Sequence, residues 1–226
     1  MKNTASIEKK VSKELGSDDD VHYMFSANTP IRNDAFDLGD EEKIKLIAKH
    51  FRDIMMVMGL DLEDDSLKDT PGRVAKMYIK EVFSGLNPLN KPEITLFENK
   101  YNYNEMLVER NITVHSYCEH HFVPIIGKAH VAYISNGKVI GLSKINRLVQ
   151  YYSKRPQVQE RLTVQIAIAL KEALCSESVA VMIDAVHHCV TSRGVNDTGS
   201  STVTTHFSGQ FAEEKYRKEF LEFVKA

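Results

Sequence analysis

Two short segments that lie far apart in the chain each combine cysteine with histidine, and they constrain the fold more than any other feature. The first is Cys118-Glu119-His120-His121 and the second is His187-His188-Cys189. Together they hold two of the three cysteines and four of the nine histidines. Zinc binds thiolate and imidazole ligands, and a catalytic zinc site uses three protein ligands and keeps a fourth position for water. The fold is therefore expected to bring the two segments together around a metal ion.

The expected ligands are Cys118, His121 and Cys189. The first two are three residues apart, so one turn can direct both side chains at a single ion. A buried cysteine beside surface histidines is the alternative for either segment alone, because short motifs are weak evidence. Two such segments in one chain favour the metal site. His120 and His187 flank these ligands and can transfer protons near pH 7, where imidazole titrates; the alternative is that they only orient the site.

Composition limits the classes of function. The chain has 226 residues, 42% of them hydrophobic, which is enough for one large domain or for a domain with a helical appendage. A formal net charge of −2 gives no reason to expect a nucleic-acid partner. No apolar run reaches the ~18 residues of a membrane-spanning helix, and the polar N-terminus lacks the apolar core of a signal peptide. Three cysteines without regular spacing fit a reducing cytoplasm better than a disulfide framework.

The chain is expected to divide into three regions. Residues 1–38 are polar and are expected to form a flexible tail. Residues 39–95 are expected to form a small N-terminal helical domain, with one helix from Asp40 and a second from Thr70-Pro71 to about Phe83. The spacing of apolar residues predicts the buried stripe of the first helix at Ile44, Ile47, Phe51, Ile54, Met55 and Met58.

Residues 96–226 are expected to form an α+β catalytic domain with an antiparallel sheet and two helices. Strands are predicted at Lys128–Ile134, Val179–Val190 and Ser201–Phe207. Asn136-Gly137 predicts a hairpin turn into a further short strand at Val139-Ile140. Helices are predicted from a cap at Ser143 to Tyr152 and from Pro156 onward. Alternation along the strand to Val190 would place His187 and Cys189 on one face.

Charged residues elsewhere suggest an anion site and a reader of a nucleotide base. Lys144 and Arg147 stand near the start of the helix that Ser143 is expected to cap, and the free backbone N–H groups there bind anions readily. Further cations are Arg73, Lys76 and Arg193. Each group taken alone is more simply explained as solvated surface. Gln159 and Glu160 suit the hydrogen-bonding edge of guanine, although a solvent-facing helical pair explains their spacing equally well. The sequence has no G-x-x-x-x-G-K-[ST] loop and no H-E-x-x-H motif.

At these residues the chain closely resembles the GTP cyclohydrolase I family. The resemblance covers about residues 40–226 in several long and specific blocks, which are Asp69-Thr-Pro-Gly-Arg-Val-Ala-Lys76, Ser116-Tyr-Cys-Glu-His-His-Phe122, Val139-Ile-Gly-Leu-Ser-Lys-Ile-Asn-Arg147, Arg155-Pro-Gln-Val-Gln-Glu-Arg-Leu162, His187-His-Cys189 and Ser192-Arg-Gly-Val195. It implies a T-fold catalytic domain in a ring-shaped homodecamer, a zinc cofactor (Zn2+), and conversion of GTP to 7,8-dihydroneopterin triphosphate with loss of formate.

The resemblance also implies a role for each matching residue. It assigns zinc to Cys118, His121 and Cys189, and proton transfer to His120 and His187. It makes Glu160, with Gln159 beside it, the reader of guanine. The triphosphate would be held by Ser143, Lys144, Arg147, Arg193, Arg73 and Lys76. The ring assembly that the resemblance implies suggests that sites form at subunit contacts, and Arg73 is a candidate for reaching the triphosphate in a neighbour's site.

Two other functions remain open on the sequence. One is another T-fold enzyme that acts on a purine or pterin with different chemistry. The other is a non-catalytic zinc module that binds a nucleotide.

Overall fold

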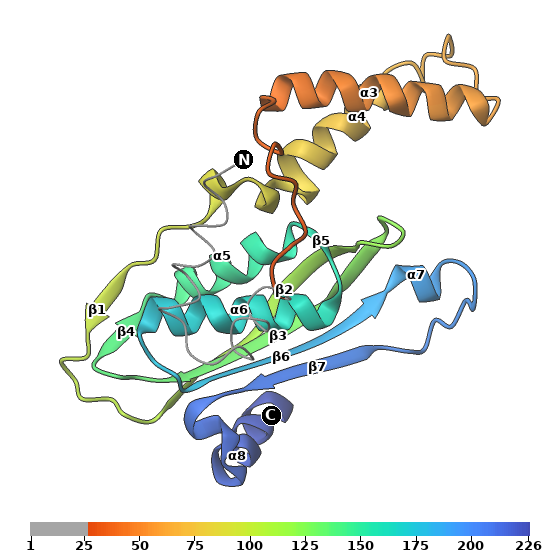
Figure 1. Cartoon of the computed structure of the whole chain (residues 1–226). Helices are drawn as coiled ribbons and strands as arrows, with labels where there is room; N and C mark the ends of the chain where they lie inside the picture. The colour runs from red at the N-terminus through yellow and green to blue at the C-terminus, as the bar shows by residue number, and fades with distance from the viewer. Residues whose placement is uncertain (1–26) are drawn as a thin grey trace. The chain divides into compact units, whose positions relative to one another are not determined.

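A five-stranded sheet with the strand order β5-β2-β3-β6-β7 forms the centre of the structure (Figure 1). Its strands are β2 (Met106–Cys118), β3 (Pro124–Ile134), β5 (Pro156–Gln157), β6 (Val179–His187) and β7 (Thr202–Phe207). Neighbouring strands from β2 to β7 are antiparallel, and the short β5 lies parallel to β2. The structure is a computed structural model and describes residues 27–226; residues 1–26, which hold most of the expected tail, lie outside the described residues.

Two helices, α5 (Leu142–Ser153) and α6 (Gln159–Leu174), cover one face of this sheet (Figure 1). Alternation along each strand directs every second side chain to that face, where it packs against the two helices. The buried residues of this core include Val114, Val131, Tyr133, Val181, Ile183, Ile145, Leu148, Leu162, Ile166 and Leu170. The antiparallel sheet and its two helices confirm the α+β class and form a T-fold.

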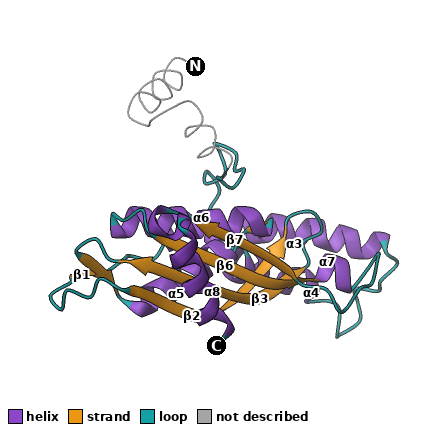
Figure 2. Ribbon diagram, turned by 90° about the horizontal axis from the view of Figure 1, so that it is seen from below, coloured by secondary structure: helices purple, strands orange, loops and turns teal. Residues whose placement is uncertain are grey.

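The opposite face of the sheet is covered by a C-terminal helix, α8 (Glu214–Lys225), which the sequence analysis did not predict. Its Phe220 is fully buried and packs with Phe211, which belongs to the preceding 3-10 turn η4 (Gly209–Ala212). The strand residues in this second cluster are Met106, Ala132, Ile134 and Ala180. They alternate with the residues under α5 and α6, so they point to the other face. Figure 2 shows the sheet from below, with α8 in front of its strands.

The N-terminal part of the described chain is helical. It consists of α3 (Asp40–Val57), α4 (Thr70–Lys76), a π-helical continuation η1 (Met77–Val82) and the 3-10 turns η2 (Ser84–Leu86) and η3 (Pro88–Asn90). The predicted helix starts at Asp40 and at Thr70 are confirmed. Residues 31–226 form one compact unit, and a separate helical domain that ends near residue 95 stays a prediction. Among the described residues, no helix is both long enough and apolar enough to cross a membrane.

The predicted buried stripe of α3 is only partly correct. Ile44 and Met55 are buried, but Ile54 is 51% exposed and Met58 is 70% exposed. The helix packs against α4 along one narrow side. Ile47 and Phe51 are half-buried, and only Ile54 and Met58 of the predicted stripe face a surface that no described element of this chain covers.

Two predictions about turns and caps are wrong. Gly137 does occupy a left-handed turn, at φ 88°, but β4 (Lys138–Ile140) pairs with β1 (Leu96–Glu98) and not with β3. Ser143 is not the cap of α5, because the helix begins one residue earlier, after Gly141, and no side chain caps it. Ser143 therefore lies within the first helical turn, where its backbone N–H is still without an intrahelical partner.

Two predicted element boundaries are also wrong. Pro156 does not begin a helix, because Pro156 and Gln157 pair with the end of β2 as strand β5, and α6 starts at Gln159. The strand predicted to reach Val190 ends at His187, where the chain turns into the short helix α7 (His188–Thr191). Cys189 therefore stands on a helical turn and not on a strand face.

Candidate metal centre and active site

One end of the sheet brings the two Cys/His segments together. Cys118 is the last residue of β2, His121 follows in the turn to β3, and Cys189 lies in α7 directly after β6. Because β2 and β6 are both antiparallel to β3, which lies between them, their C-terminal ends lie at the same end of the sheet. One ligand atom from each of the three residues lies within 4.8 Å of the other two. The structure therefore assembles the expected ligand set, and these residues could hold a metal ion.

The chemistry of the three donors fits a transition metal of the zinc type. Two sulfur donors and one imidazole form a soft set, and three ligands leave a position open. Burial raises the pKa of the Cys189 thiol, and the adjacent Cys118 raises it further. A divalent cation would reverse this effect, because a metal ion deprotonates the thiols that bind it. Cys175 is exposed after the far end of α6 and takes no part in the cluster.

The two histidines expected to move protons flank this cluster. Nδ1 of His120 lies 3.7 Å from Sγ of Cys118, and the His120 side chain is 64% exposed. His187 ends β6, and its Nε2 lies 2.7 Å from Oε1 of Gln159. Burial lowers the pKa of His187, while the nearby carboxylate of Glu160 acts in the opposite direction. His187 is therefore positioned as a largely neutral imidazole next to the metal cluster.

An ion pair that the sequence analysis missed anchors the turn that carries the ligands. Glu119 accepts two hydrogen bonds from Arg161 on α6, at 2.5 and 3.2 Å, and both side chains are largely buried. The hydrogen bonds from Arg161 hold the pKa of Glu119 below its ordinary value. Such bidentate pairs fix geometry as well as charge. The two residues lie far apart in sequence, so no local pattern could have revealed the pair.

Two more of the expected site residues lie at this end of the sheet. Arg193 donates a hydrogen bond of 2.9 Å to Nε2 of His121. Glu160 is exposed in the first turn of α6, close enough to His187 to affect its pKa. The metal ligands, His120, His187, the carboxylate of Glu160 and the guanidinium of Arg193 thus lie at one end of the sheet. This combination suits hydrolysis of a polar, anionic substrate.

The amino-acid sequence was compared with those of known protein families and proteins. The sequence profile of GTP cyclohydrolase I matches residues 47–225. The chain belongs to the GTP cyclohydrolase I family. It is 58% identical over 206 residues to GTP cyclohydrolase 1 of Flavobacterium johnsoniae, which covers 91% of this chain and 92% of that protein. GTP cyclohydrolase 1 of Erwinia tasmaniensis is 54% identical over 209 residues, with 91% and 95% covered.

One solved structure, of the archaeosine synthase QueF-Like in its apo form, aligns with this chain, and the alignment covers 46% of this chain and 92% of the synthase chain. The TM-score is 0.37 and the sequence identity 21%, a likeness too slight to bear on function.

Within this member of the GTP cyclohydrolase I family, the cations of α5 lie away from the metal cluster. Nδ2 of Asn146 on α5 donates a 3.0 Å hydrogen bond to Oε1 of Glu109. Glu109 precedes Cys118 by nine residues on β2, which corresponds to about 30 Å of strand. Ser143 and Lys144, still nearer the start of α5, are therefore not brought to the metal cluster of the same chain.

Arg147 also lies outside the metal cluster. It lines a small polar pocket between α5 and the η2–η3 turns, together with Lys154 and Gly85. The pocket contains none of the metal-cluster residues.

The two cations of α4 are placed differently. Arg73 and Lys76 are exposed, and Arg73 makes a loose 3.5 Å ion pair with Asp69. The helix continues into η1, where the centroid of the Tyr78 ring lies 6.3 Å from the centroid of the Phe122 ring. Phe122 directly follows His121, so α4 leads to the metal-binding turn of its own chain.

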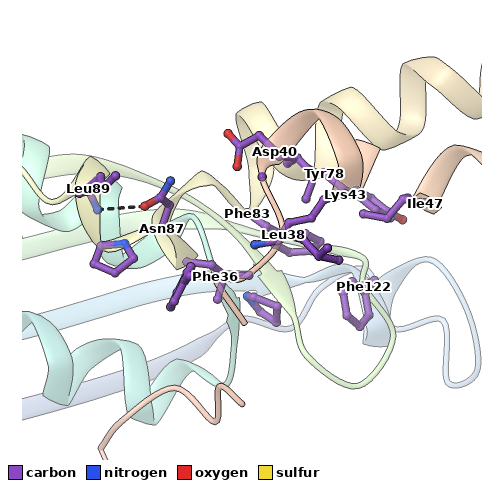
Figure 3. Close-up of a pocket in the computed structure, with 15 residues that line it drawn as sticks. Phe36, Leu38, Asp40, Lys43, Ile47, Tyr78, Phe83, Asn87, Leu89 and Phe122 are labelled. Carbon is purple, nitrogen blue, oxygen red and sulfur yellow. Dashed lines mark hydrogen bonds between the residues drawn. The ribbon is translucent and has the colours of Figure 1, made fainter. Parts of the chain in front are cut away.

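A pocket of about 770 Å³ lies beside Phe122 but does not contain the metal cluster (Figure 3). Most of its lining is apolar, with Phe36, Leu38, Tyr78 and Phe83 among the side chains drawn. Lys43 is the one cationic residue of the lining, and its Nζ donates to the carbonyl of Ala35 at 2.6 Å. This pocket therefore does not suit a triphosphate, and the polar edge of the sheet is the better candidate for the active site.

Proposed function

We propose that the chain is a zinc-dependent GTP cyclohydrolase I. It would hydrolyse the imidazole ring of GTP, release formate and rearrange the remainder to 7,8-dihydroneopterin triphosphate. The observation that carries the proposal is the cluster of Cys118, His121 and Cys189 beside two histidines, in a chain that belongs to this family. The unpaired cysteines fit a reducing cytoplasm, which we propose as its compartment.

The residues divide the chemistry between them. Cys118, His121 and Cys189 would hold zinc, which when bound supplies a Lewis acid and lowers the pKa of water to about 7. His187 and His120 would transfer protons, including the proton that N7 takes up as water adds to C8. The ring opens to a formamide and a second hydrolysis releases formate. The ribose then opens, rearranges and recloses onto the freed amine.

The substrate would be held at both of its ends. Glu160 would accept hydrogen bonds from the N1–H and amino groups of guanine. The triphosphate would lie among cations, with Arg193, Arg73 and Lys76 from the same chain. Lys144, Arg147 and Ser143 would come from elsewhere in an assembly.

One assay tests the proposal directly. The purified protein is incubated with GTP, and the mixture is analysed for formate and, after oxidation, for a fluorescent neopterin. Formation of both products is expected. Consumption of GTP without formate would favour another T-fold enzyme, and GTP that is bound but unchanged would favour a non-catalytic zinc module.

The metal assignment makes its own prediction. Elemental analysis should find close to one zinc per chain, and Cys118→Ala, His121→Ala and Cys189→Ala should each lose most of it. Cys175→Ala is the matched control, because this thiol is exposed and remote from the cluster, and it should keep its zinc. Full zinc retention in Cys189→Ala would exclude the three-ligand site.

We also propose that the active form is an assembly of identical chains, a ring-shaped homodecamer. The support is the position of the α5 cations, about 30 Å along β2 from the metal cluster of the same chain. A second copy can supply them, because every contact in a ring repeats. The exposed apolar residues of α3 offer further surface for contacts between copies. This geometry favours Lys144 over Arg73 as the cation that serves a neighbouring site.

Mixed assemblies test that choice. Cys189→Ala lacks the metal but keeps Lys144, and Lys144→Ala keeps the metal but lacks the cation, so each alone should have little activity. In co-assembled rings of equal parts, about a quarter of sites would pair an intact metal cluster with an intact neighbouring lysine. Activity should recover to roughly that fraction of wild type. Rings of proven mixed composition without recovery would show that Lys144 does not serve a neighbouring site, and Arg73→Ala in its place tests the alternative.

A further inference from the structure

Gln159 begins α6 next to Glu160, but its side chain is arranged quite differently. Glu160 is exposed, whereas Gln159 is only 1% exposed. The Gln159 amide group is hydrogen-bonded at both ends. Its Nε2 lies 3.1 Å from the carbonyl oxygen of Ile183, 2.8 Å from that of Thr202 and 3.1 Å from Oγ1 of Thr204. The side chain therefore lies inside the protein and is not open to a base in the active site.

These contacts fix which way the amide faces. Backbone carbonyl oxygens only accept hydrogen bonds, so the NH2 end of Gln159 must face Ile183 and Thr202. Oε1 must then face His187, whose Nε2 is 2.7 Å away. Because an amide oxygen cannot donate, Nε2 of His187 must carry the hydrogen of this bond.

The hydroxyl groups of Thr163 and Thr204 also contact Gln159, and their hydrogen-bond directions agree with this orientation of the amide. Oγ1 of Thr163 donates to the backbone carbonyl of Gln159 at 2.9 Å, so its hydrogen is already used. The 2.7 Å contact between the hydroxyls of Thr163 and Thr204 then requires Thr204 to donate. Oγ1 of Thr204 is left free to accept from Nε2 of Gln159. The donors and acceptors of both threonines thus agree with an amide whose NH2 end faces β6 and β7 and whose oxygen accepts from His187.

We propose that Gln159 is a positioning residue that holds the imidazole of His187 in one orientation and in the Nε2–H tautomer. Nδ1 is then the nitrogen that exchanges a proton with the substrate. This inference rests on the proposed function for the role of His187, and it deepens that role. It also separates two residues that are adjacent in sequence, since Glu160 would contact guanine while the Gln159 side chain acts only through His187.

Gln157 offers a matched control for a variant of Gln159. It is also a fully buried glutamine at this end of the sheet, and its Nε2 donates to the carbonyl of Tyr152 at 2.9 Å and to Gln165 at 2.8 Å. It makes no contact with His187 that would set a tautomer. Gln159→Leu and Gln157→Leu therefore remove similar buried amides, but only the first should change His187.

The first measurement needs no turnover. The imidazole ¹⁵N signals of labelled protein report which nitrogen carries hydrogen, and the signals of His187 are identified by their loss in His187→Ala. Wild type and Gln157→Leu should show Nε2–H with an unprotonated Nδ1, and Gln159→Leu should show a mixture. A wild-type spectrum with Nδ1–H would overturn the proposal, even if Gln159→Leu does not fold.

The second measurement is a double-mutant cycle on GTP turnover. Gln159→Leu should lower kcat on the order of 10–100-fold, as loss of a group that orients a site residue does, with little change in KM. In a His187→Ala background the same change should have no further effect, because its partner is gone. A further loss there, or a raised KM, would show that Gln159 contacts GTP directly. Absence of turnover in wild type would instead refute the proposed function and leave the tautomer result intact.

Discussion

Replacement of His187 by alanine should lower the turnover of GTP by on the order of 10²–10⁴-fold, the usual contribution of a general acid or base. His187 lies at the end of β6 and its side chain is not part of the three-ligand cluster. Its half-buried position lowers its pKa, so the neutral ring that prevails near pH 7 can both take up and return a proton. The change removes a proton carrier and leaves the metal ligands in place. The loss should therefore appear in kcat and not in zinc content or in the affinity for GTP.

Steady-state kinetics, zinc analysis and direct GTP binding check this prediction together. A formamide product that accumulates would show that the reaction stops between the two hydrolytic steps. His188→Ala is the matched control, because this histidine is the next residue in the chain but starts α7 and has no assigned role. Turnover close to wild type in His187→Ala would remove this residue from the mechanism.

The metal ligands could be predicted from sequence because their signal is local. Cys118 and His121 lie three residues apart, and the chemistry of thiolate and imidazole points to a metal without knowledge of the fold. Cys189 needed the second segment as well. The structure brings all three within 4.8 Å, although Cys189 reaches the cluster from a helical turn and not from the predicted strand.

The residues that position the site could not be predicted, because their partners are remote in sequence. Arg161 meets Glu119, and Gln159 meets His187, only after α6 has packed on the sheet. The sequence places Glu160, with Gln159 beside it, at the guanine edge, and nothing in it shows that the Gln159 side chain is buried. Burial separates them, and burial is a property of the tertiary fold.

The errors in the fold have the same origin. The sequence correctly predicts a turn at Gly137 and a short strand after it, but the predicted hairpin is wrong because β4 pairs with β1, a strand about 40 residues earlier in the chain. The apolar spacing of α3 correctly indicated a helix, yet spacing does not tell whether this chain or another copy covers the stripe. The exposure of Ile54 and Met58 is consistent with the second possibility.

Replacement of Glu160 by alanine should strongly reduce kcat/KM for GTP and should abolish most of the preference for guanine over other bases. The N1–H and amino groups of guanine both donate hydrogen bonds, and one carboxylate can accept both. Adenine has no hydrogen on N1 and no 2-amino group. A site built on such polar pairs rejects the wrong ligand by about 10⁴ or more, because the polar groups that the bound ligand covers are left unpaired. Wild type should therefore use GTP and reject ATP by about this factor.

The comparison of GTP, ATP and inosine triphosphate resolves the contact further. Inosine triphosphate keeps N1–H but lacks the amino group, so wild type should use it less well than GTP, and Glu160→Ala should discriminate far less between the two. Glu172→Ala is the control, since Glu172 is exposed on the same helix but lies twelve residues, or about 18 Å, further along α6. Because Glu160 is exposed at the edge that holds His187, a direct contact with the base needs no rearrangement of the fold. If Glu160→Ala and wild type treat the three nucleotides alike, another residue reads the base.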